Sequence, residues 1–307
     1  IHLHNLHDSY INLPMLFSYI KRRHIATVWT LHDCWSFTGQ CPHFTMVNCE
    51  KWKDGCYDCP QYKEYPPTVY DNTKRMWKLK RKWFTGVENM TIVTPSKWLA
   101  ELVRKSYLKE YPVKVINNGI DLEIFKPTPC DDMKCVWGGN LNKFIVLFVS
   151  FGWSVYKGLD IIVELSKQLT DRYQIVVVGS DDKTDALLTD NVISIHRTQD
   201  QEQLAKIYSA ADVFANPTRE EMFGMVNIEA LACGTPVVTF RTGGSPECID
   251  AKSGIVVEKN DIEGMKNAIT QICEKQLFRK SDCVNRARVF EGVKKYEEYI
   301  ELYEKIG

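Results

Sequence analysis

The sequence predicts a mixed α/β protein with parallel sheets, arranged as two doubly wound domains. Two observations carry this prediction. The second half of the chain alternates short apolar runs with helix-length amphipathic segments, which is the pattern of a doubly wound sheet. The chain has 307 residues, enough for two domains of ordinary size, and 44% of them are hydrophobic, enough to fill two cores. No run of about 20 apolar residues is present, so we expect no membrane span.

In the first half, apolar runs predict short strands separated by helices. The strands are expected at residues 1–4, 26–31, 90–94 and 113–116, and the helices at residues 11–21 and from Ser96, which is a good N-cap. The run 26–31 leads directly into His32 and Asp33. Parallel sheets bind ligands at the carboxyl ends of their strands, so His32 lies where a ligand is expected.

In the second half the alternation is regular. Strands are expected at residues 144–151, 174–178, 192–195, 213–215 and 237–240, and helices at residues 157–170 and 200–211, after Gly224, and from Arg279 to the end. No Gly-x-Gly-x-x-Gly follows any of these strands, which argues against a nicotinamide dinucleotide, and the P-loop motif is absent.

Residues 216–236 form the most informative stretch of the chain. Glu221 and Glu229 lie on either side of a Phe-Gly pair that opens a helix. Free amides at a helix N-terminus bind phosphate, and a carboxylate accepts hydrogen bonds from two neighbouring hydroxyls. A nucleoside-diphosphate sugar offers both kinds of group. The alternative interpretation is that these are acidic residues favoured near a helix start by the helix dipole.

The whole run, Glu-x-Phe-Gly-x-x-x-x-Glu-Ala-x-Ala-x-Gly-x-Pro-Val-Val, resembles the donor-site motif of the retaining family 4 glycosyltransferases, also called group 1, of GT-B fold. The bacterial surface-polysaccharide type is the one expected. The resemblance implies two Rossmann-like domains facing across a cleft: residues 1–127 on the acceptor side, residues 128–285 on the donor side, and a terminal helix, 286–307, that crosses back to the first domain. An ordinary capping helix of the second domain would show the same spacing. The resemblance also implies a further strand–loop–helix block before Ile1, so we expect a truncated chain.

The same resemblance assigns roles to individual residues. Glu229 would bind the ribose, Glu221 the transferred sugar and Lys157 the diphosphate, while His32, with Asp33 as an orienting partner, would act catalytically beside Glu221 and Lys157. The family's usual Arg before the Lys is absent, and Arg197 is a candidate to compensate. The implied donor-binding residues are Gly152, Ser154, Lys157, Arg197, Glu221, Phe223, Gly224, Met225, Val226 and Glu229.

The function expected from the resemblance is transfer of a sugar, with retention, from a UDP- or GDP-sugar to a hydroxyl of a glycan or lipid-linked acceptor. No Asp-x-Asp pair is available for Mg²⁺, so metal-independent catalysis is expected. Two alternatives stay open: a nucleotide-sugar epimerase of the same fold, and a non-catalytic sugar-nucleotide-binding protein.

A second cluster lies in the loop 34–70. Cys41, Cys49, Cys56 and Cys59 fall within nineteen residues and end in a Cys-x-x-Cys, a ligand set that suits tetrahedral, structural zinc. Cys34 and His43 are possible substitutes. The alternatives are free structural thiols, or disulfides in an oxidising compartment. No signal peptide is visible, so a reducing cytoplasm is expected.

Charge is balanced overall, which gives no general argument for nucleic acid as a partner. Residues 1–127 carry 18 Lys/Arg against 12 Asp/Glu, and the remainder carries 21 against 27. Six of the cations lie between residues 71 and 87, among aromatic residues. This segment predicts a basic amphipathic helix, which suits peripheral contact with an anionic inner membrane surface, although most such runs are solvated helix faces.

Overall fold

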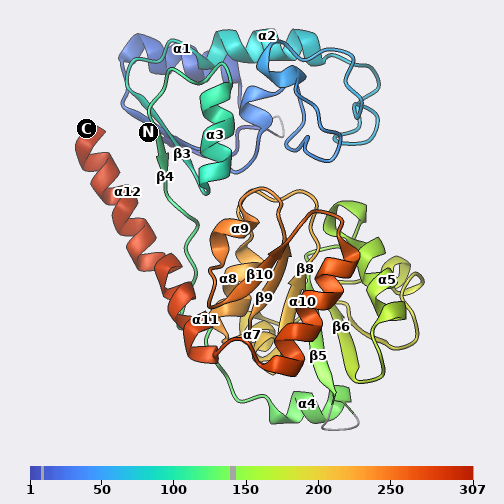
Figure 1. Cartoon of the computed structure of the whole chain (residues 1–307). Coiled ribbons are helices and arrows are strands. Elements are labelled where there is room, and N and C mark those ends of the chain that lie inside the picture. Colours follow the sequence, from blue (N-terminus) through green and yellow to red (C-terminus); the bar gives the residue numbers. More distant parts are fainter. Residues whose placement is uncertain (8–9, 139–142, 307) are drawn as a thin grey trace. The chain divides into compact units, whose positions relative to one another are not determined.

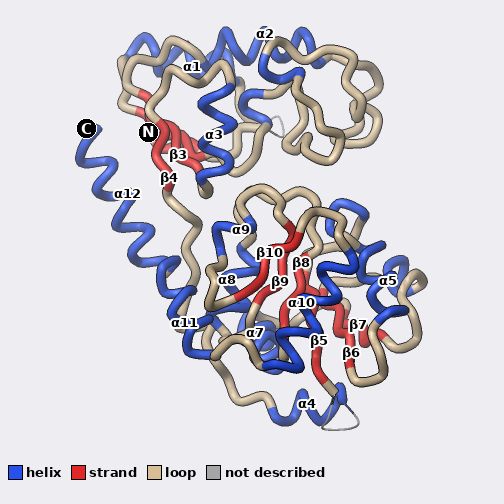
Figure 2. Tube along the Cα trace, in the orientation of Figure 1, coloured by secondary structure: helices blue, strands red, loops and turns tan. Residues whose placement is uncertain are grey.

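The structure is a computed structural model that describes residues 1–7, 10–138 and 143–306 (Figure 1). The chain forms two compact units: Ile1–Asn117 with Lys295–Gly307, and Asn118–Lys294. Each unit contains its own parallel sheet with packed helices (Figure 2). The predicted mixed α/β architecture is therefore confirmed.

The first unit has a four-stranded parallel sheet in which the strands follow chain order. Its strands are β1 (His2–Leu3), β2 (Thr27–Thr30), β3 (Met90–Thr94) and β4 (Val113–Val115). Its helices are α1 (Leu13–Arg23), α2 (Thr73–Phe84), α3 (Lys97–Lys105) and most of α12 (Gly292–Ile306). Ser96 caps α3 as predicted, because its hydroxyl accepts a hydrogen bond from the Leu99 amide.

Neighbouring residues of β2 pack on opposite faces of this sheet, as the period of a strand requires. Val28 packs with Leu302 of α12 in one buried cluster. Trp29 packs on the other face against Phe17 of α1 and Phe84 of α2, with ring centroids 5.5 and 4.9 Å away. The basic helix α2 thus has a buried apolar side.

The long segment between β2 and α2 has little regular structure. It holds two 3₁₀ turns, η1 (Trp35–Phe37) and η2 (Lys51–Lys53). Phe37 and Phe44 pack on Trp52, with centroids 5.3 and 5.2 Å apart. Aromatic packing therefore gives this segment a small core of its own.

The second unit has a six-stranded, all-parallel sheet in the order β10-β9-β8-β5-β6-β7. The strands are β5 (Phe144–Val149), β6 (Tyr173–Val178), β7 (Val192–Ile195), β8 (Val213–Asn216), β9 (Val237–Phe240) and β10 (Gly254–Val257). The strands β6 and β7 follow on one side of β5. The chain then returns to the other side of β5, where it forms β8, β9 and β10. Ligands in such sheets bind at this switch point, beyond the carboxyl ends of β5 and β8.

Helices cover both faces of this sheet (Figure 1). Along β5, Ile145 and Leu147 belong to one buried cluster and Val146 and Phe148 to the other. The helices of this unit are α4 (Asp131–Gly138), α5 (Leu159–Gln168), α6 (Asp182–Asp185), α7 (Gln201–Ala210), α8 (Met225–Ala232), α9 (Ser245–Cys248), α10 (Ile262–Lys275) and α11 (Lys280–Ala287), with 3₁₀ turns η3 (Val155–Lys157) and η4 (Arg288–Phe290).

The structure differs from the sequence expectations in several places. The sequence analysis did not predict the strand β10 or the helices α4, α6, α9 and α10. The helix expected from Arg279 to the end is interrupted between α11 and α12, where the Gly292 amide donates to the Ile120 carbonyl at 2.9 Å. The units divide between Asn117 and Asn118 rather than near residue 127, because Ile120 and Phe125 are buried in the core of the second unit. Residues 139–142 of the expected connection lie outside the described residues.

Candidate functional site

Two loops at the switch point of the second sheet carry the residues expected to bind a donor. One follows β5 and contains η3, which ends at Lys157, and the other follows β8 and leads to Gly224 at the start of α8. Because β5 and β8 are paired neighbours, both loops leave the sheet at the same edge. The sequence separates them by about sixty residues, and the topology brings them together.

Lys157 and Glu221 meet across these two loops. The Lys157 Nζ lies 3.4 Å from the Glu221 Oε2, and the two side chains are 40% and 19% exposed. The other oxygen of Glu221, Oε1, accepts a hydrogen bond from the Met222 amide at 3.1 Å. The carboxylate is therefore held in place while the ammonium keeps an exposed side that can bind a second anion.

Arg219 is a site residue that the sequence analysis missed. Its guanidinium donates to both carboxylate oxygens of Asp160, at 2.6 and 2.7 Å, and to the Val155 carbonyl at 2.6 Å. Its Nε donates to the Asn260 Oδ1 at 2.6 Å. Hydrogen bonding to Arg219 lowers the pKa of Asp160 below its ordinary value. Arg219 thus ties the loop of Lys157 to the loop of Glu221.

Trp153 and Ser154 occupy the neighbourhood where the family's Arg is expected, and Trp153 has a structural role. Its indole donates to the Val178 carbonyl at 3.0 Å, and its ring packs on the core of the second unit. Gly158 follows Lys157 with φ +80°, and a Cβ at Gly158 would lie 2.5 Å from the Pro217 carbonyl oxygen. Only glycine allows this close approach of the two loops.

A third loop, after β9, supports the backbone of Glu221. A Cβ at Gly243 would lie 1.6 Å from the Glu221 carbonyl oxygen, and Gly243 has φ +52°. The Gly244 amide lies 3.4 Å from the same oxygen. A side chain at position 243 would therefore displace Glu221.

The start of α8 presents backbone amides, as the sequence predicts. Gly224 is the N-cap with φ 101°, a conformation that glycine adopts without strain. Among the hydrogen bonds of the described residues, none uses the amides of Phe223, Gly224 or Met225 as donors. Val226 lies in the first turn behind them. Such amides at a helix N-terminus are suited to bind phosphate or a sugar oxygen.

Glu229 lies one turn further along α8 and has a buried partner. The Tyr208 hydroxyl of α7 donates to the Glu229 Oε2 at 2.9 Å. Burial raises the pKa of Glu229 above its ordinary value, and the hydrogen bond from Tyr208 opposes this shift. Tyr208 could not be identified from the sequence, because α7 comes before β8 and meets α8 only in the folded unit.

The remaining donor-side residues are more peripheral. Gly152 and Ser154 are exposed in the β5 loop. Arg197 is exposed after the edge strand β7, with β6 between β7 and β5. Near Arg197 the fold brings together one ligand atom each from Asp182, Asp185 and His196, a cluster that no sequence pattern showed. The His196 Nε2 lies 2.6 Å from the Asp185 Oδ2, and this bond raises the pKa of His196.

His32 lies in the first unit, in a small pocket at the carboxyl ends of β1 and β2. The His32 Nε2 lies 2.9 Å from the His4 Nδ1. Burial, helped by His4, lowers the pKa of His32 below its ordinary value. Asp33, expected to orient His32, instead accepts from the Trp35 amide at 2.8 Å and contacts the His7 Nε2 at 3.1 Å. His4 is therefore the residue that positions His32.

Cys41, Cys49, Cys56 and Cys59 line a second pocket in the first unit. Cys34 is buried just before η1 and is not among its lining residues, and neither is His43.

Comparisons with known proteins agree with this architecture. The solved structure of sucrose-phosphate synthase from Thermosynechococcus elongatus matches with a TM-score of 0.71 at 23% identity, covering 94% of this chain and 70% of that one. HepE from Anabaena, solved in complex with UDP, matches with a TM-score of 0.70 at 18% identity, covering 95% of this chain and 76% of that one. The fold is that of the GT-B glycosyltransferases, which defines the class of this protein.

Family comparison adds the particular group. The sequence model described as "Glycosyltransferase Family 4" matches residues 1–124, and the one described as "Glycosyl transferases group 1" matches residues 143–275. The chain belongs to the family 4, group 1 glycosyltransferases, and it is a glycosyltransferase.

Two relatives illustrate its place in that family. The putative colanic acid biosynthesis glycosyl transferase WcaC of Escherichia coli K12 is 24% identical over 316 residues, which cover the whole of this chain and 76% of WcaC. The D-inositol 3-phosphate glycosyltransferase of Mycolicibacterium smegmatis is 30% identical over 176 residues, which cover 53% of this chain and 40% of that protein. The chain thus matches about two fifths of the inositol enzyme's length.

Proposed function

We propose that this protein transfers a sugar from a nucleoside-diphosphate sugar to a hydroxyl acceptor in glycan biosynthesis, with retention at the anomeric carbon. The observation that carries the proposal is the pairing of Lys157 with Glu221 beside the amides of α8, at the switch point of the second sheet. The complexes of HepE with UDP and with UDP-glucose support a donor of this class.

Each group has a role in this reaction. The Lys157 ammonium and the amides of Gly224 and Met225 stabilise the negative charge that grows on the departing diphosphate, a term that is often the largest in such reactions. The Glu221 carboxylate accepts hydrogen bonds from hydroxyls of the transferred sugar, and Glu229 accepts those of the ribose. Because Lys157 supplies positive charge, we propose that catalysis does not depend on a divalent cation.

The test compares nucleotide binding and turnover in matched variants of the whole chain. Lys157→Ala is expected to weaken nucleoside-diphosphate binding by about tenfold to a hundredfold, the worth of one charged hydrogen bond. Glu221→Gln is expected to lower turnover with little effect on the affinity for the free nucleotide, which lacks the sugar. Lys183→Ala, an exposed lysine of α6, is the control.

Calorimetric titration with UDP, GDP and ADP, followed by product analysis with the corresponding sugars, gives the readout. Transfer to a hydroxyl, unaffected by added Mg²⁺, supports the proposal. Conversion of the sugar nucleotide without an acceptor would indicate an epimerase. Binding without conversion would indicate a non-catalytic protein. Full activity of both variants would contradict the assigned site.

We also propose that the acceptor side of the protein contacts an anionic membrane surface through α1 and α2. The exposed cations of α2 are Lys74, Arg75, Lys78, Arg81 and Lys82. The Lys21 ammonium of α1 donates to the Lys82 carbonyl at 3.3 Å, which places the basic ends of both helices together. Met15 and Tyr19 of α1 are 69% and 48% exposed. Cations beside exposed apolar side chains suit the interface of an anionic bilayer. Among the described residues no helix is both long and apolar enough to cross a membrane.

Sedimentation with lipid vesicles tests this contact. Binding to phosphatidylserine vesicles is expected at low salt, with weak binding to phosphatidylcholine alone. The double variant Arg75→Glu/Lys78→Glu should lose at least about tenfold in affinity, since each cation near such a surface contributes about 1 kcal/mol. Lys183→Glu in the second unit is the charge-matched control. Equal binding of all three proteins would contradict the proposed surface.

A further inference from the structure

We propose that Cys41, Cys49, Cys56 and Cys59 bind a structural zinc ion that holds together the long loop of the first unit. This site is separate from the donor site, and the proposal does not depend on the proposed function. The catalytic residues lie on other segments, and four protein ligands leave no coordination position for a substrate.

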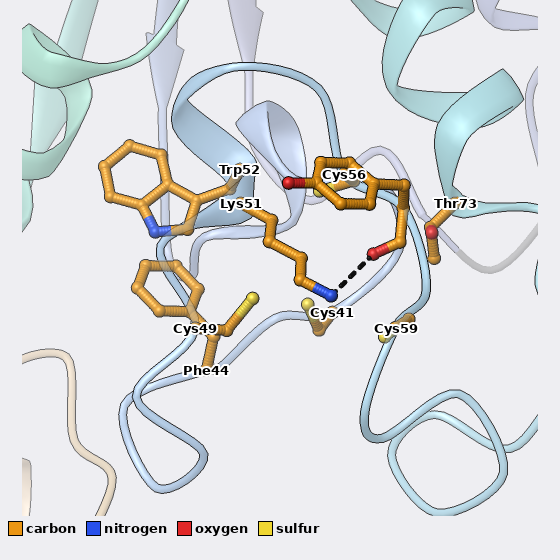
Figure 3. Close-up of a pocket in the computed structure, with 9 residues that line it drawn as sticks. Cys41, Phe44, Cys49, Lys51, Trp52, Cys56, Cys59 and Thr73 are labelled. Carbon is orange, nitrogen blue, oxygen red and sulfur yellow. Dashed lines mark hydrogen bonds between the residues drawn. The ribbon is translucent and has the colours of Figure 1, made fainter.

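The four side chains converge on one pocket, which they line together with Phe44, Lys51, Trp52, Tyr57 and Thr73 (Figure 3). Cys41 and Cys56 are buried, and Cys49 and Cys59 are partly exposed. Figure 3 shows the sulfur atoms of Cys41 and Cys49 turned toward the same space. Four thiols that line one pocket provide a ligand set for a soft metal.

The backbone around the Cys-x-x-Cys is held in a conformation that suits a metal-binding turn. Cys56 and Asp58 both have positive φ, 42° and 43°, which is uncommon for residues other than glycine and persists where surrounding contacts impose it. The Gly39 amide donates to the Cys56 Sγ at 3.1 Å. Hydrogen bonds of this kind orient a metal-binding thiolate and stabilise its charge.

Positive charge lies beside the thiols. The Lys51 ammonium donates to the carbonyls of Tyr57 and Asp58, at 3.1 and 2.8 Å, and lines the same pocket. A zinc ion with four thiolates carries a net charge of about −2, because each ligand must lose its proton to bind. The neighbouring ammonium offsets part of that charge and fixes the turn between Cys56 and Cys59.

The four thiols line the same pocket, but their sulfurs are not at the spacing of a tetrahedral site. Among the described residues no three cysteine sulfurs lie within 4.8 Å of one another. Tetrahedral zinc with bonds of about 2.3 Å would bring its sulfurs to about 3.8 Å apart. The segment that must adjust has two short 3₁₀ turns as its regular structure, so it can close around the ion. A loop of this length with so little regular structure gains most from such a clip.

The test begins with the unaltered chain, purified without chelators. Elemental analysis is expected to find about one zinc per chain, and X-ray absorption to show four sulfur ligands at about 2.3 Å. Replacement by Co²⁺ should produce the intense thiolate-to-cobalt absorption of a tetrahedral site. A chain that holds no zinc after equilibration with the ion, or that contains a disulfide among these four cysteines, would overturn the proposal.

Variants then assign the ligands. Cys59→Ser is expected to lower zinc affinity at least a hundredfold, whereas Cys273→Ser, a buried thiol of the second unit, should retain the full metal content. Nucleoside-diphosphate binding should be unchanged in both, so that failure of this proposal is distinguishable from failure of the donor site. If Cys59→Ser does not fold, the zinc content and cobalt spectrum of the unaltered chain decide the question. Full zinc content in a folded Cys59→Ser would contradict the site.

Discussion

Arg219 shows how a single residue can set the geometry of the proposed donor site through contacts within the protein. Its side chain is 9% exposed, and its four hydrogen bonds are to the segment 155–160 and to Asn260. Four of the five guanidinium N–H donors are therefore used within the protein, so Arg219 is a poor substitute for the phosphate-binding Arg that the family resemblance implies. Lys157 is left as the main side-chain cation at the paired loops.

Replacing Arg219 tests this positioning role. Arg219→Ala leaves Asp160 and the Val155 carbonyl without their donor, so we expect a loss of roughly 2–3 kcal/mol in the free energy of unfolding. Nucleotide affinity should fall as well, because the loop of Lys157 loses its tether. Arg219→Lys should recover part of the lost stability, because lysine keeps the positive charge. The recovery should be incomplete, because lysine cannot make the paired hydrogen bonds of a guanidinium.

Urea denaturation and calorimetric titration on both variants provide the measurements. Lys167→Ala, an exposed lysine of α5, serves as the control. Undiminished nucleotide affinity in a destabilised Arg219→Ala would show that Arg219 contributes to stability alone.

Glu229 combines a cost in stability with a proposed role in binding. Its pKa is raised by burial, so the folded protein binds its proton more tightly than the unfolded chain does. The contribution of Glu229 to stability is therefore most favourable at low pH and decreases as the pH rises through the unfolded value of 4.5 to the higher folded value. Glutamine has no charge to desolvate and can still accept from Tyr208.

We therefore expect Glu229→Gln to raise the melting temperature at pH 7–8 and to leave it nearly unchanged near pH 4. The same variant should weaken binding of a nucleoside diphosphate, because a neutral amide accepts weaker hydrogen bonds from ribose hydroxyls. Scanning calorimetry across this pH range, with and without nucleotide, measures both effects. A melting temperature that falls equally at both pH values would contradict the buried-charge argument.

At the scale of elements, α12 is a helix that the sequence predicted without predicting the unit against which it packs. Tyr299 and Tyr303 of α12 contact the Thr30 hydroxyl and the His2 Nδ1, at 3.0 and 2.7 Å, and Leu302 packs in the core of the first unit. The spacing of these residues predicted a helix but not its partner, because a capping helix of either unit has the same apolar stripe. The contacts across nearly three hundred residues settle the choice.

The strands of both sheets were largely predictable, since runs such as 90–94 and 144–149 are apolar and β-branched. The strand β10 was missed because its four residues are mostly half-buried at the sheet edge and stand out little from the surrounding loops. The break before α12 was missed for another reason. It depends on the Gly292–Ile120 hydrogen bond, a tertiary contact that no local pattern contains.

The residues of the candidate site also fall into two groups, those that a local sequence motif identifies and those that only tertiary contacts reveal. Glu221, Glu229 and Lys157 were identified because the motif is local and long, and the pairing of Lys157 with Glu221 follows once β5 and β8 are neighbours. Tyr208, Arg219 and His4 were missed, since each acts on a residue of another segment. The sequence alone thus predicted the residues expected to contact a ligand more successfully than it predicted the residues that position them.

At the scale of the whole molecule, each unit has its own sheet and its own buried clusters. Units with separate cores can unfold in separate transitions. Six of the eight tryptophans lie in residues 1–117, so tryptophan fluorescence reports mainly on the first unit, while calorimetry reports on both. This uneven distribution allows the two transitions to be assigned without dividing the chain.

We expect two transitions that respond to different ligands. A nucleoside diphosphate at a hundred times its dissociation constant adds about 2.7 kcal/mol, which should raise the transition of the second unit by roughly 5–10 °C. The fluorescence-detected transition should not move with nucleotide, but its temperature should fall when a chelator removes the zinc proposed for the cysteine loop. A single transition, detected by both fluorescence and calorimetry, that rises with nucleotide and falls with the chelator would show that the units unfold together. Two independent cores cannot share the free energy of one bound ligand.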